Sequence, residues 1–272
     1  MNKPPVALTI AGSDCSAGAG MQADLKSFQH FGVHGLTAVT CVVSETANIV
    51  RAVHAVPTEL VRDQISLLME SFPVAAVKTG MLFSTQIILA VAEILKAHPS
   101  VPLVVDPVMV ASTGDSLLEN DAVAAYRAML LPLATLVTPN LPEAGILLGR
   151  TISGEDALEK AAIDLSAKLG TAVLLKGGHL PGELCVDLLA HKGKTQRFEA
   201  ARIPVLASHG TGCTLSAAIT ALLARGEPLE RAVGLAKRYL GETLFHSYAL
   251  RAANGETVHA LNQGTTFRKN ET

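Results

Sequence analysis

The most constraining feature of this sequence is the alternation of short, continuously apolar runs with longer segments of helical period. Such runs are typical of strands covered by helices on both faces, because neither side of the strand meets water. Glycine, proline, asparagine and aspartate mark the joints between segments. The pattern predicts an α/β fold of three layers, with a mostly parallel central sheet between two layers of helices. Expected strands are Val6–Ile10, Leu36–Val43, Ala75–Lys78, Leu103–Val105, Leu136–Val137 and Ala172–Leu175, and expected helices are Gln22–Phe31, Thr58–Ser71, Thr85–Ala97, Glu119–Leu131, Pro142–Leu148 and Gly154–Leu169.

The later part of the chain departs from this alternation. Cys185–Ala190 and Gln196–Glu199 predict a hairpin that adds antiparallel strands at one edge of the sheet. Two long helices are expected over Thr214–Arg225 and Leu229–Leu250, followed by a polar, loosely ordered tail over 254–272. Because no linker or internal repeat divides the sequence, we predict a single domain over residues 1–272.

Composition excludes several classes of protein. With 49% hydrophobic residues, 17% charged residues and a net charge of −2, the chain has neither the composition of a disordered protein nor a basic surface for nucleic acid. The residues Met1–Ile10 lack the pattern of a secretory signal, and no apolar run approaches the roughly 18 residues of a membrane span. Cys15, Cys41, Cys185 and Cys213 lie far apart, so neither a zinc site nor a disulfide framework is expected. These observations favour a protein of the reducing cytoplasm.

Residues able to bind ligands follow most of the expected strands. In an open parallel sheet, ligands bind beyond the carboxyl ends of the strands, near the point where the strand order reverses. The sequence therefore predicts a ligand site at one edge of the sheet. The residues that follow the strands are Gly12-Ser13-Asp14, Glu45, Gly80-Met81, Asp106-Pro107, Pro139-Asn140 and Gly177-Gly178.

The first glycine cluster, Gly12–Ala23, allows three interpretations. It contains Gly18-x-Gly20-x-x-Ala23, and Glu45 ends the following strand, which together imitate a fingerprint for a nicotinamide dinucleotide. The match begins well after the first strand, whereas the fingerprint normally sits at the turn from strand to helix. A flexible turn is the second interpretation. The sequence favours the third, a glycine loop that encloses the substrate.

The second cluster, Ser208–Ala218, places two glycines immediately before an apolar helix. Unpaired amides in the first turn and the helix dipole favour an anion there, so Gly210, Thr211, Gly212 and Cys213 are predicted to cradle a phosphate. The cluster is not a P-loop, because Gly-x-x-x-x-Gly-Lys-Ser/Thr is absent from it. The dipole also predicts a lowered thiol pKa for Cys213, as a proton acceptor or an anion-site donor. The alternative is a small buried apolar residue.

Three charged residues stand at the ends of expected strands or just beyond them. Asp106 and Glu143 are candidate magnesium ligands, because Mg²⁺ usually takes one or two carboxylates with phosphate oxygens and waters. The alternatives are a turn residue before proline for Asp106 and a first-turn helix carboxylate for Glu143. Lys176 is expected to contact nucleotide phosphates, or else to reach solvent from the strand end. His179 and His209 are expected to have supporting or structural roles.

Seven spaced motifs together resemble the hydroxymethylpyrimidine/phosphomethylpyrimidine kinases of thiamine biosynthesis, which belong to the ribokinase-like superfamily. The resemblance runs in order from about Val6 to Leu250. The motifs are Ala11-Gly12-Ser13-Asp14, Gly18 to Lys26, Lys78-Thr79-Gly80-Met81-Leu82, Val105-Asp106-Pro107-Val108-Met109, Thr138 to Glu143, Lys176-Gly177-Gly178-His179-Leu180 and His209 to Ala218.

The resemblance implies a ribokinase-like homodimer that uses ATP and Mg²⁺. Its expected reaction phosphorylates 4-amino-5-hydroxymethyl-2-methylpyrimidine and then the monophosphate, giving the diphosphate used to build thiamine. Carried over position by position, Cys213 takes the place of the catalytic aspartate of related sugar kinases, within an anion hole formed by Gly210 to Cys213. Metal ligation falls to Asp106 and Glu143, nucleotide binding to Asn140, Lys176, Gly177, Gly210 and Gly212, and substrate binding to Gly12, Asp24, Glu45, Gly80, Met81 and Val108.

The chain departs from the family pattern at the substrate end. Cys15 and Ala17 replace a proline and a glycine of the usual first loop, and Glu45 stands where many members carry a glutamine that recognises the pyrimidine edge. Ionised Glu45 only accepts hydrogen bonds, so the ring is expected to bind as its cation, or another heterocycle is used. A pyridoxal kinase of the same superfamily is therefore one alternative. A nicotinamide-dependent oxidoreductase and a non-catalytic binder are the others.

Overall fold

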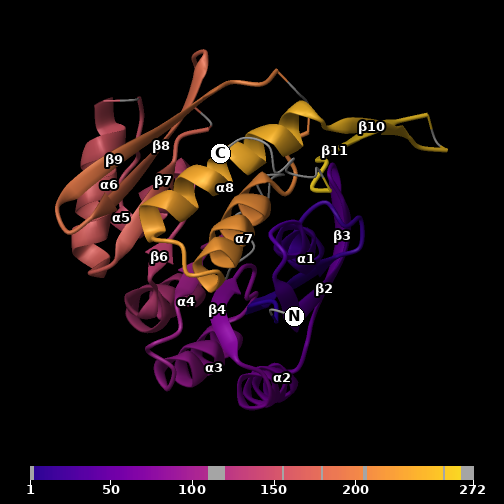
Figure 1. Ribbon diagram of the computed structural model, residues 1–272, viewed down its shortest axis with the longest axis vertical. Coiled ribbons are helices and arrows are strands. Elements are labelled where there is room, and N and C mark those ends of the chain that lie inside the picture. The colour runs from indigo at the N-terminus through magenta and orange to yellow at the C-terminus, as the bar shows by residue number, and fades with distance from the viewer. Residues whose placement is uncertain are drawn as a thin grey trace.

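The computed structural model describes residues 3–109, 120–154, 156–178, 180–204, 207–253 and 255–264. Strands and helices alternate along most of this length (Figure 1). The strands are β1 (Val6–Asp14), β2 (His34–Thr46), β3 (Ile49–Ala55), β4 (Val74–Thr79), β5 (Leu103–Val105), β6 (Leu136–Val137), β7 (Ala172–Lys176), β8 (Leu184–His191), β9 (Lys194–Ala201), β10 (Tyr248–Arg251) and β11 (Thr257–Ala260). The helices are α1 (Gly20–His30), α2 (Thr58–Ser71), α3 (Thr85–Lys96), α4 (Asn120–Ala125), α5 (Leu141–Leu148), α6 (Asp156–Leu169), α7 (Thr211–Ala224) and α8 (Leu229–Phe245), with a π-helical turn over Tyr126–Leu130 and a 3₁₀ turn over Leu131–Leu133 after α4.

Nine strands of the described chain form one sheet in the order β3-β2-β1-β4-β5-β6-β7-β8-β9. Six neighbouring strands are parallel, in the order β2-β1-β4-β5-β6-β7. Antiparallel strands lie at the two edges, β3 at one and the β8–β9 pair at the other. The order reverses at β1, since β2 lies on one side of it and β4 on the other. Ligand sites of open α/β sheets lie beyond the carboxyl ends of strands at such a point.

Each face of the sheet carries its own apolar core. Leu103 and Val105 pack into the core that α2 to α6 cover, whereas Val104 between them packs against α7 and α8. Figure 1 looks onto the layer that contains α7 and α8. Because alternate residues of one strand enter different cores, the strand has no polar side, which explains the continuous apolar runs of the sequence.

Most of the predicted elements are confirmed. The bounds agree fully for Leu103–Val105, Leu136–Val137 and Thr58–Ser71, and the antiparallel hairpin is β8–β9. Helix α7 begins at Thr211, three residues before the predicted start, so its first turn lies within the second glycine cluster. Residues Glu119 and His179, which fall in predicted segments, lie outside the described residues.

Two predictions about the last part of the chain are wrong. The helix expected over Leu229–Leu250 ends at Phe245, and Tyr248–Arg251 forms β10 instead. Part of the tail expected to be loosely ordered is β11, which pairs with β10 in antiparallel fashion. Strand pairing across about ten residues therefore prevails over the helical period of the sequence.

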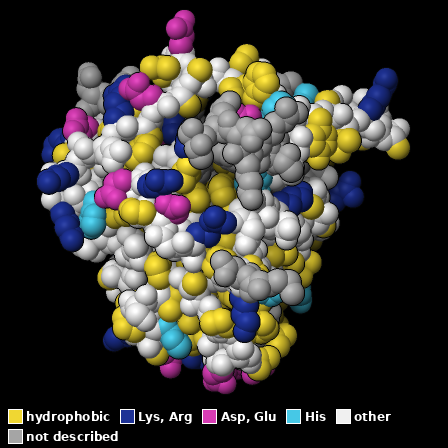
Figure 2. All heavy atoms as spheres, viewed as in Figure 1, with side chains coloured by type: hydrophobic (Ala, Val, Ile, Leu, Met, Phe, Trp, Pro, Cys, Tyr) yellow, Lys and Arg dark blue, Asp and Glu magenta, His cyan; other side chains and the backbone are white. Residues whose placement is uncertain are grey.

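The β10–β11 hairpin projects from the body of the molecule (Figure 1), and hydrophobic side chains gather on it in the space-filling view (Figure 2). Phe245, Tyr248 and Leu250 are 70%, 47% and 55% exposed at its base and along β10. No helix within the described ranges is both long and apolar enough to cross a membrane.

Candidate active site

A pocket of about 440 Å³ lies at the carboxyl ends of the parallel strands, as the sequence predicts. It is lined by residues of β1, β2, β3, β4 and β7, by the segments that follow β1, β4, β5 and β6, and by the beginning of α7. Twelve of the predicted site residues line it together: Gly12, Glu45, Met81, Asp106, Val108, Asn140, Glu143, Lys176, Gly210, Thr211, Gly212 and Cys213.

The remaining three predicted residues do not line this pocket. Asp24 is fully buried behind it, and the carbonyl of Gly80 accepts a hydrogen bond from the Tyr126 hydroxyl at 3.3 Å. The N–H of Gly177 donates to Asp187 Oδ1 at 3.1 Å. These positions support the pocket wall, and a direct contact with a ligand is not available to the Asp24 side chain.

The second glycine cluster forms the N-terminus of α7. Gly210 precedes the helix in the left-handed region with φ of 82°, and its carbonyl accepts the Thr214 N–H at 2.8 Å. A Cβ at this position would lie 1.9 Å from the carbonyl oxygen of Gly18, so glycine is required. The amides of the first turn have no helix carbonyl four residues before them, and the turn borders the pocket. This is the geometry of an anion-binding helix N-terminus.

The predicted low pKa of Cys213 is wrong. Burial raises the pKa of the Cys213 thiol to about 11, although the nearby Lys78 ammonium acts in the opposite direction. The negative charges of Asp24 and Asp106 add to the increase. The field of the helix dipole is smaller than the cost of a buried thiolate beside two carboxylates, so the thiol is protonated at neutral pH.

Asp106 is the centre of a cluster of polar contacts at the end of β5. Its Oδ1 accepts from Lys176 Nζ at 3.0 Å and from the Thr138 hydroxyl at 3.1 Å, while Oδ2 accepts from the Ser216 hydroxyl at 3.3 Å. Burial acts to raise the pKa of this carboxyl, but Lys176 and Lys78 hold it below its ordinary value. Lys176 therefore does not reach out to solvent, since it is held against Asp106 at the pocket wall.

Glu143 caps α5 and also lines the pocket. The Asn140 N–H donates to Glu143 Oε2 at 2.8 Å, and the Glu143 N–H donates to Asn140 Oδ1 at 2.9 Å, which is a complete capping box. Burial raises the pKa of Glu143 to about 7; Lys176 opposes this effect and Asp106 adds to it. The first-turn role considered from the sequence is thus present together with a place at the site.

The two carboxylates fit a divalent cation that also binds phosphate oxygens. Asp106 and Glu143 lie in one pocket, and the charge of Asp106 raises the pKa of Glu143, so a cation between them and a phosphate chain would relieve this repulsion. Within the described residues no group of three or more His, Cys, Asp or Glu forms a complete metal cage. The residues therefore suit Mg²⁺ bound jointly with a nucleotide.

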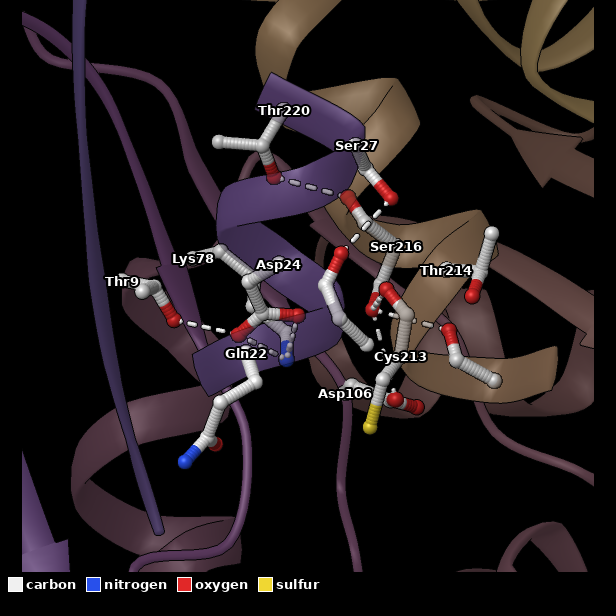
Figure 3. A network of polar contacts seen from close by, with 12 residues as sticks. Thr9, Gln22, Asp24, Ser27, Lys78, Asp106, Cys213, Thr214, Ser216 and Thr220 are labelled. Carbon is white, nitrogen blue, oxygen red and sulfur yellow. Dashed lines mark hydrogen bonds and ion pairs between the residues drawn. The ribbon is translucent and has the colours of Figure 1, made fainter. Parts of the chain in front are cut away.

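At the inner wall of the pocket, which Lys78 lines, Asp24 and Lys78 form a fully buried ion pair. Lys78 Nζ donates to both carboxylate oxygens of Asp24, at 2.8 and 2.9 Å, and the Thr9 hydroxyl donates to Oδ2 at 2.6 Å. Figure 3 shows these contacts close to Cys213 and the first turn of α7. The pair places a cation beside the Cys213 thiol without exposing it to water.

The first glycine loop is organised around Asp14, which the sequence placed after the first strand without assigning it a role. Its carboxylate accepts the N–H groups of Ser16, Gly18 and Ala19 at 2.7, 3.1 and 2.8 Å, and Oδ2 lies 2.9 Å from His209 Nε2. These bonds outweigh burial and hold the pKa of Asp14 well below its usual range. Aspartate within a glycine-rich turn is the signal that indicates such a role.

Comparisons with known proteins find a matching family model and similar curated proteins. The family model described as phosphomethylpyrimidine kinase matches residues 14–258. A hydroxymethylpyrimidine/phosphomethylpyrimidine kinase of Rhizobium meliloti is 45% identical over 95% of this chain and 97% of its own length. A thiamine biosynthesis bifunctional protein of Geobacter sulfurreducens is 42% identical over 93% of this chain, which spans only 52% of that longer protein.

Solved structures of two enzymes are also similar to this chain. A pyridoxal kinase from Staphylococcus aureus, in complex with AMP-PCP, has a TM-score of 0.88 and 34% identity over 99% of this chain and 97% of its own. A phosphomethylpyrimidine kinase from Clostridium difficile has a TM-score of 0.77 and 40% identity over 88% of this chain and 98% of its own. Both likenesses place the sheet and its helices in the ribokinase-like fold.

Proposed function

The chain belongs to the phosphomethylpyrimidine kinase family, and on that premise we propose that it phosphorylates 4-amino-5-hydroxymethyl-2-methylpyrimidine and then its monophosphate, with ATP as donor. The observation that carries this proposal is the juxtaposition, in one pocket, of an anion-binding helix N-terminus with Lys176 and two carboxylates. The product is the diphosphate that thiamine biosynthesis requires.

On the nucleotide side, phosphoryl transfer needs alignment and stabilisation of spread negative charge, with little covalent chemistry from the protein. The amides of Gly210 to Cys213 and the Lys176 ammonium are placed to provide that stabilisation. Asp106 and Glu143 would hold Mg²⁺, which supplies additional positive charge at the phosphate oxygens. Asn140 frames the nucleotide from the end of β6, while Gly177, hydrogen-bonded to Asp187, supports the pocket wall behind Lys176.

On the acceptor side, Cys213 assists removal of the hydroxyl proton. The thiol is neutral at pH 7, and Lys78 is the group that most favours its thiolate against the effect of burial. The small thiolate fraction is the base: it takes the hydroxyl proton and becomes the thiol, and because the proton leaves late in a loose transition state, full ionisation of Cys213 is not required. The second transfer needs less help, because a phosphate oxygen is already an anion.

The acceptor ring lies against Gly12, Met81 and Val108 in our proposal, with Glu45 at its polar edge. The Cys15 thiol contacts both the N–H and the carbonyl of Glu45, at 3.3 and 3.2 Å, and so fixes the backbone there. Burial and the nearby Asp14 raise the pKa of Glu45, with His209 opposing them. Either form of the carboxyl pairs with a pyrimidine edge: the ionised form with a ring cation, the protonated form as a glutamine would.

A coupled assay of ADP release tests the proposal. Hydroxymethylpyrimidine, its monophosphate and pyridoxal are supplied as separate acceptors, with ATP and Mg²⁺. We expect turnover of both pyrimidines, and turnover of pyridoxal alone would contradict the proposal. The pyridoxal arm is included because a pyridoxal kinase from Staphylococcus aureus has a TM-score of 0.88 with this chain. Loss of turnover on chelation of Mg²⁺ would support the metal assignment.

We also propose that the protein is a homodimer of the cytoplasm. The exposed Phe245, Tyr248 and Leu250 form an apolar surface suited to a second copy. All four cysteines are free thiols, which suits a reducing compartment. Measurement of mass in solution for the wild type and for Leu250→Asp tests the dimer, since a dimer through this surface should dissociate in the variant.

A further inference from the structure

The two glycine loops of the pocket touch each other directly. A Cβ at Gly18 would lie 2.7 Å from His209 Cδ2, and a Cβ at Gly210 would lie 1.9 Å from the Gly18 carbonyl oxygen. The acceptor side and the anion-binding side of the pocket thus meet at Gly18 and Gly210.

A third segment, from beyond β11, reaches this junction. Gln263 Nε2 donates to the Gly18 carbonyl at 3.1 Å and to the Thr214 hydroxyl at 3.0 Å. Gly18 belongs to the first loop and Thr214 to the first turn of α7. One amide group therefore bridges the two walls of the pocket.

Two hydrogen bonds with α8 fix the segment that carries Gln263. The Tyr239 hydroxyl donates to the Gln263 carbonyl at 2.8 Å, and the Asn262 N–H donates to the Thr243 carbonyl at 3.1 Å, both from α8. Gln263 is 2% exposed, and Thr214 and Tyr239 are fully buried. Water does not replace these contacts easily, so their loss leaves buried polar groups without partners.

We propose that Gln263 is a positioning residue of the kinase, which joins the first glycine loop to the first turn of α7 and so fixes the acceptor against the anion-binding amides. The family model ends at residue 258, so the residue lies outside the part of the chain that the family match covers. Gln263 does not line the pocket, and it acts through Gly18 and Thr214. The proposal rests on the proposed function only for the choice of acceptor in the kinetic assay.

Gln263→Met tests this role, because it keeps the length of the side chain and removes the amide. We expect kcat to fall by roughly tenfold to a hundredfold, as misplacement of about 1 Å does, while the affinities for ADP alone and for the acceptor alone stay within about twofold. Hydrogen exchange should become faster in peptides that contain Gly18 and in those that contain Thr214. The exchange measurement needs no acceptor, so it stands even where the proposed substrate proves wrong.

Gln64→Met is the matched control. The Gln64 amide also ties backbone groups together, through Val39 N–H at 2.9 Å and Val39 carbonyl at 3.3 Å, but it lies on α2 away from the pocket. This variant should lose stability with kcat unchanged and with no faster exchange at Gly18 or Thr214.

Variants of Thr214 provide a second route that does not alter Gln263. Thr214→Val should lower kcat and add little to Gln263→Met in the double variant, because both remove the same bridge, whereas Thr214→Ser should keep the wild-type kcat. Wild-type kcat in folded Gln263→Met would overturn the proposal. So would a loss of kcat matched by Gln64→Met, or unchanged hydrogen exchange in both loops.

Discussion

The two glycine loops of the pocket are similar in composition but use their amides in opposite ways. In the first, the N–H groups of Ser16, Gly18 and Ala19 all donate to the carboxylate of Asp14. In the second, Thr211 N–H donates to the Ser208 carbonyl at 3.3 Å, and no carboxylate of the described residues accepts from the first-turn amides of α7, which border the pocket. The first loop binds its own anion, and the second is suited to bind one from outside.

This difference explains why glycine spacing alone is ambiguous. Gly18-x-Gly20-x-x-Ala23 imitates a dinucleotide fingerprint, yet β1 continues to Asp14 and the amides after it are used within the loop. What distinguishes an anion site from an ordered turn is whether an internal carboxylate occupies the amides. Each of the following experiments tests one loop against the other.

The largest effect is expected at the side chain of the second loop. Cys213→Ala should lower the rate of the first phosphorylation by roughly 10²–10⁴-fold, the range of general acid–base catalysis, with a smaller loss in the second. Single-turnover rates with each of the two pyrimidine acceptors measure this. Equal losses in both steps would show that the thiol does not assist proton removal.

Gly210→Ala should affect the backbone of the second loop. The new Cβ would meet the Gly18 carbonyl, so the first-turn amides must shift, and kcat should fall by roughly 10²–10³-fold, as when an oxyanion donor is lost. Gly193→Ala is the control, because Gly193 also has positive φ, at 74°, but no atom lies within 4 Å of the added Cβ. If both variants lose activity equally, backbone strain rather than the contact with Gly18 is responsible.

In the first loop, Asp14→Asn should act mainly on stability, at a cost of about 1–3 kcal/mol in the free energy of unfolding. The folded pKa of Asp14 is depressed, so its stabilisation is present above the unfolded value of about 3.9 and is lost as pH falls through the folded pKa. Denaturant unfolding at pH 7 and pH 3 should show the difference between variant and wild type shrinking at low pH. Asp164→Asn, on the exposed face of α6, should change stability much less.

The smallest effect is expected where the first loop faces Glu45. Acceptor affinity in the wild type should vary with pH, by at most about tenfold per pH unit, as Glu45 ionises, and Glu45→Gln should remove that dependence. Calorimetric titration of hydroxymethylpyrimidine from pH 5 to 8 compares the two proteins. Parallel profiles would mean that the ionisation of Glu45 plays no part in binding.

The sequence predicts most elements of this fold well, because the apolar runs, helical periods and turn residues that mark an element lie close together in the chain. β5 and β6 are short apolar runs between turn residues, and α2 is a regular amphipathic segment, so their bounds follow from sequence. β3 was missed, since its residues Ile49–Ala55 are mostly exposed and it forms only by pairing with β2. β10 was predicted as helix, because the helical period of its residues carries no information on their pairing with β11.

The same distinction holds in the site. Residues at strand ends, such as Asp106 and Lys176, could be placed at the pocket from topology alone. The buried position of Asp24 could not be predicted in this way, because it depends on an ion pair with Lys78, which lies 54 residues away in the sequence. The dipole argument for Cys213 failed because it omitted burial and two neighbouring carboxylates. Gln263 lies in a tail whose polarity suggested disorder.

The buried pair of Asp24 and Lys78 has an evolutionary consequence. Each side chain is fully buried, so replacement of one leaves the other as an uncompensated charge, at a cost of about 3–5 kcal/mol, whereas joint replacement by apolar residues can be neutral. A lineage can therefore leave this arrangement only through two nearly simultaneous changes, on α1 and on β4. Positions 24 and 78 should therefore covary among descendants of a common ancestor.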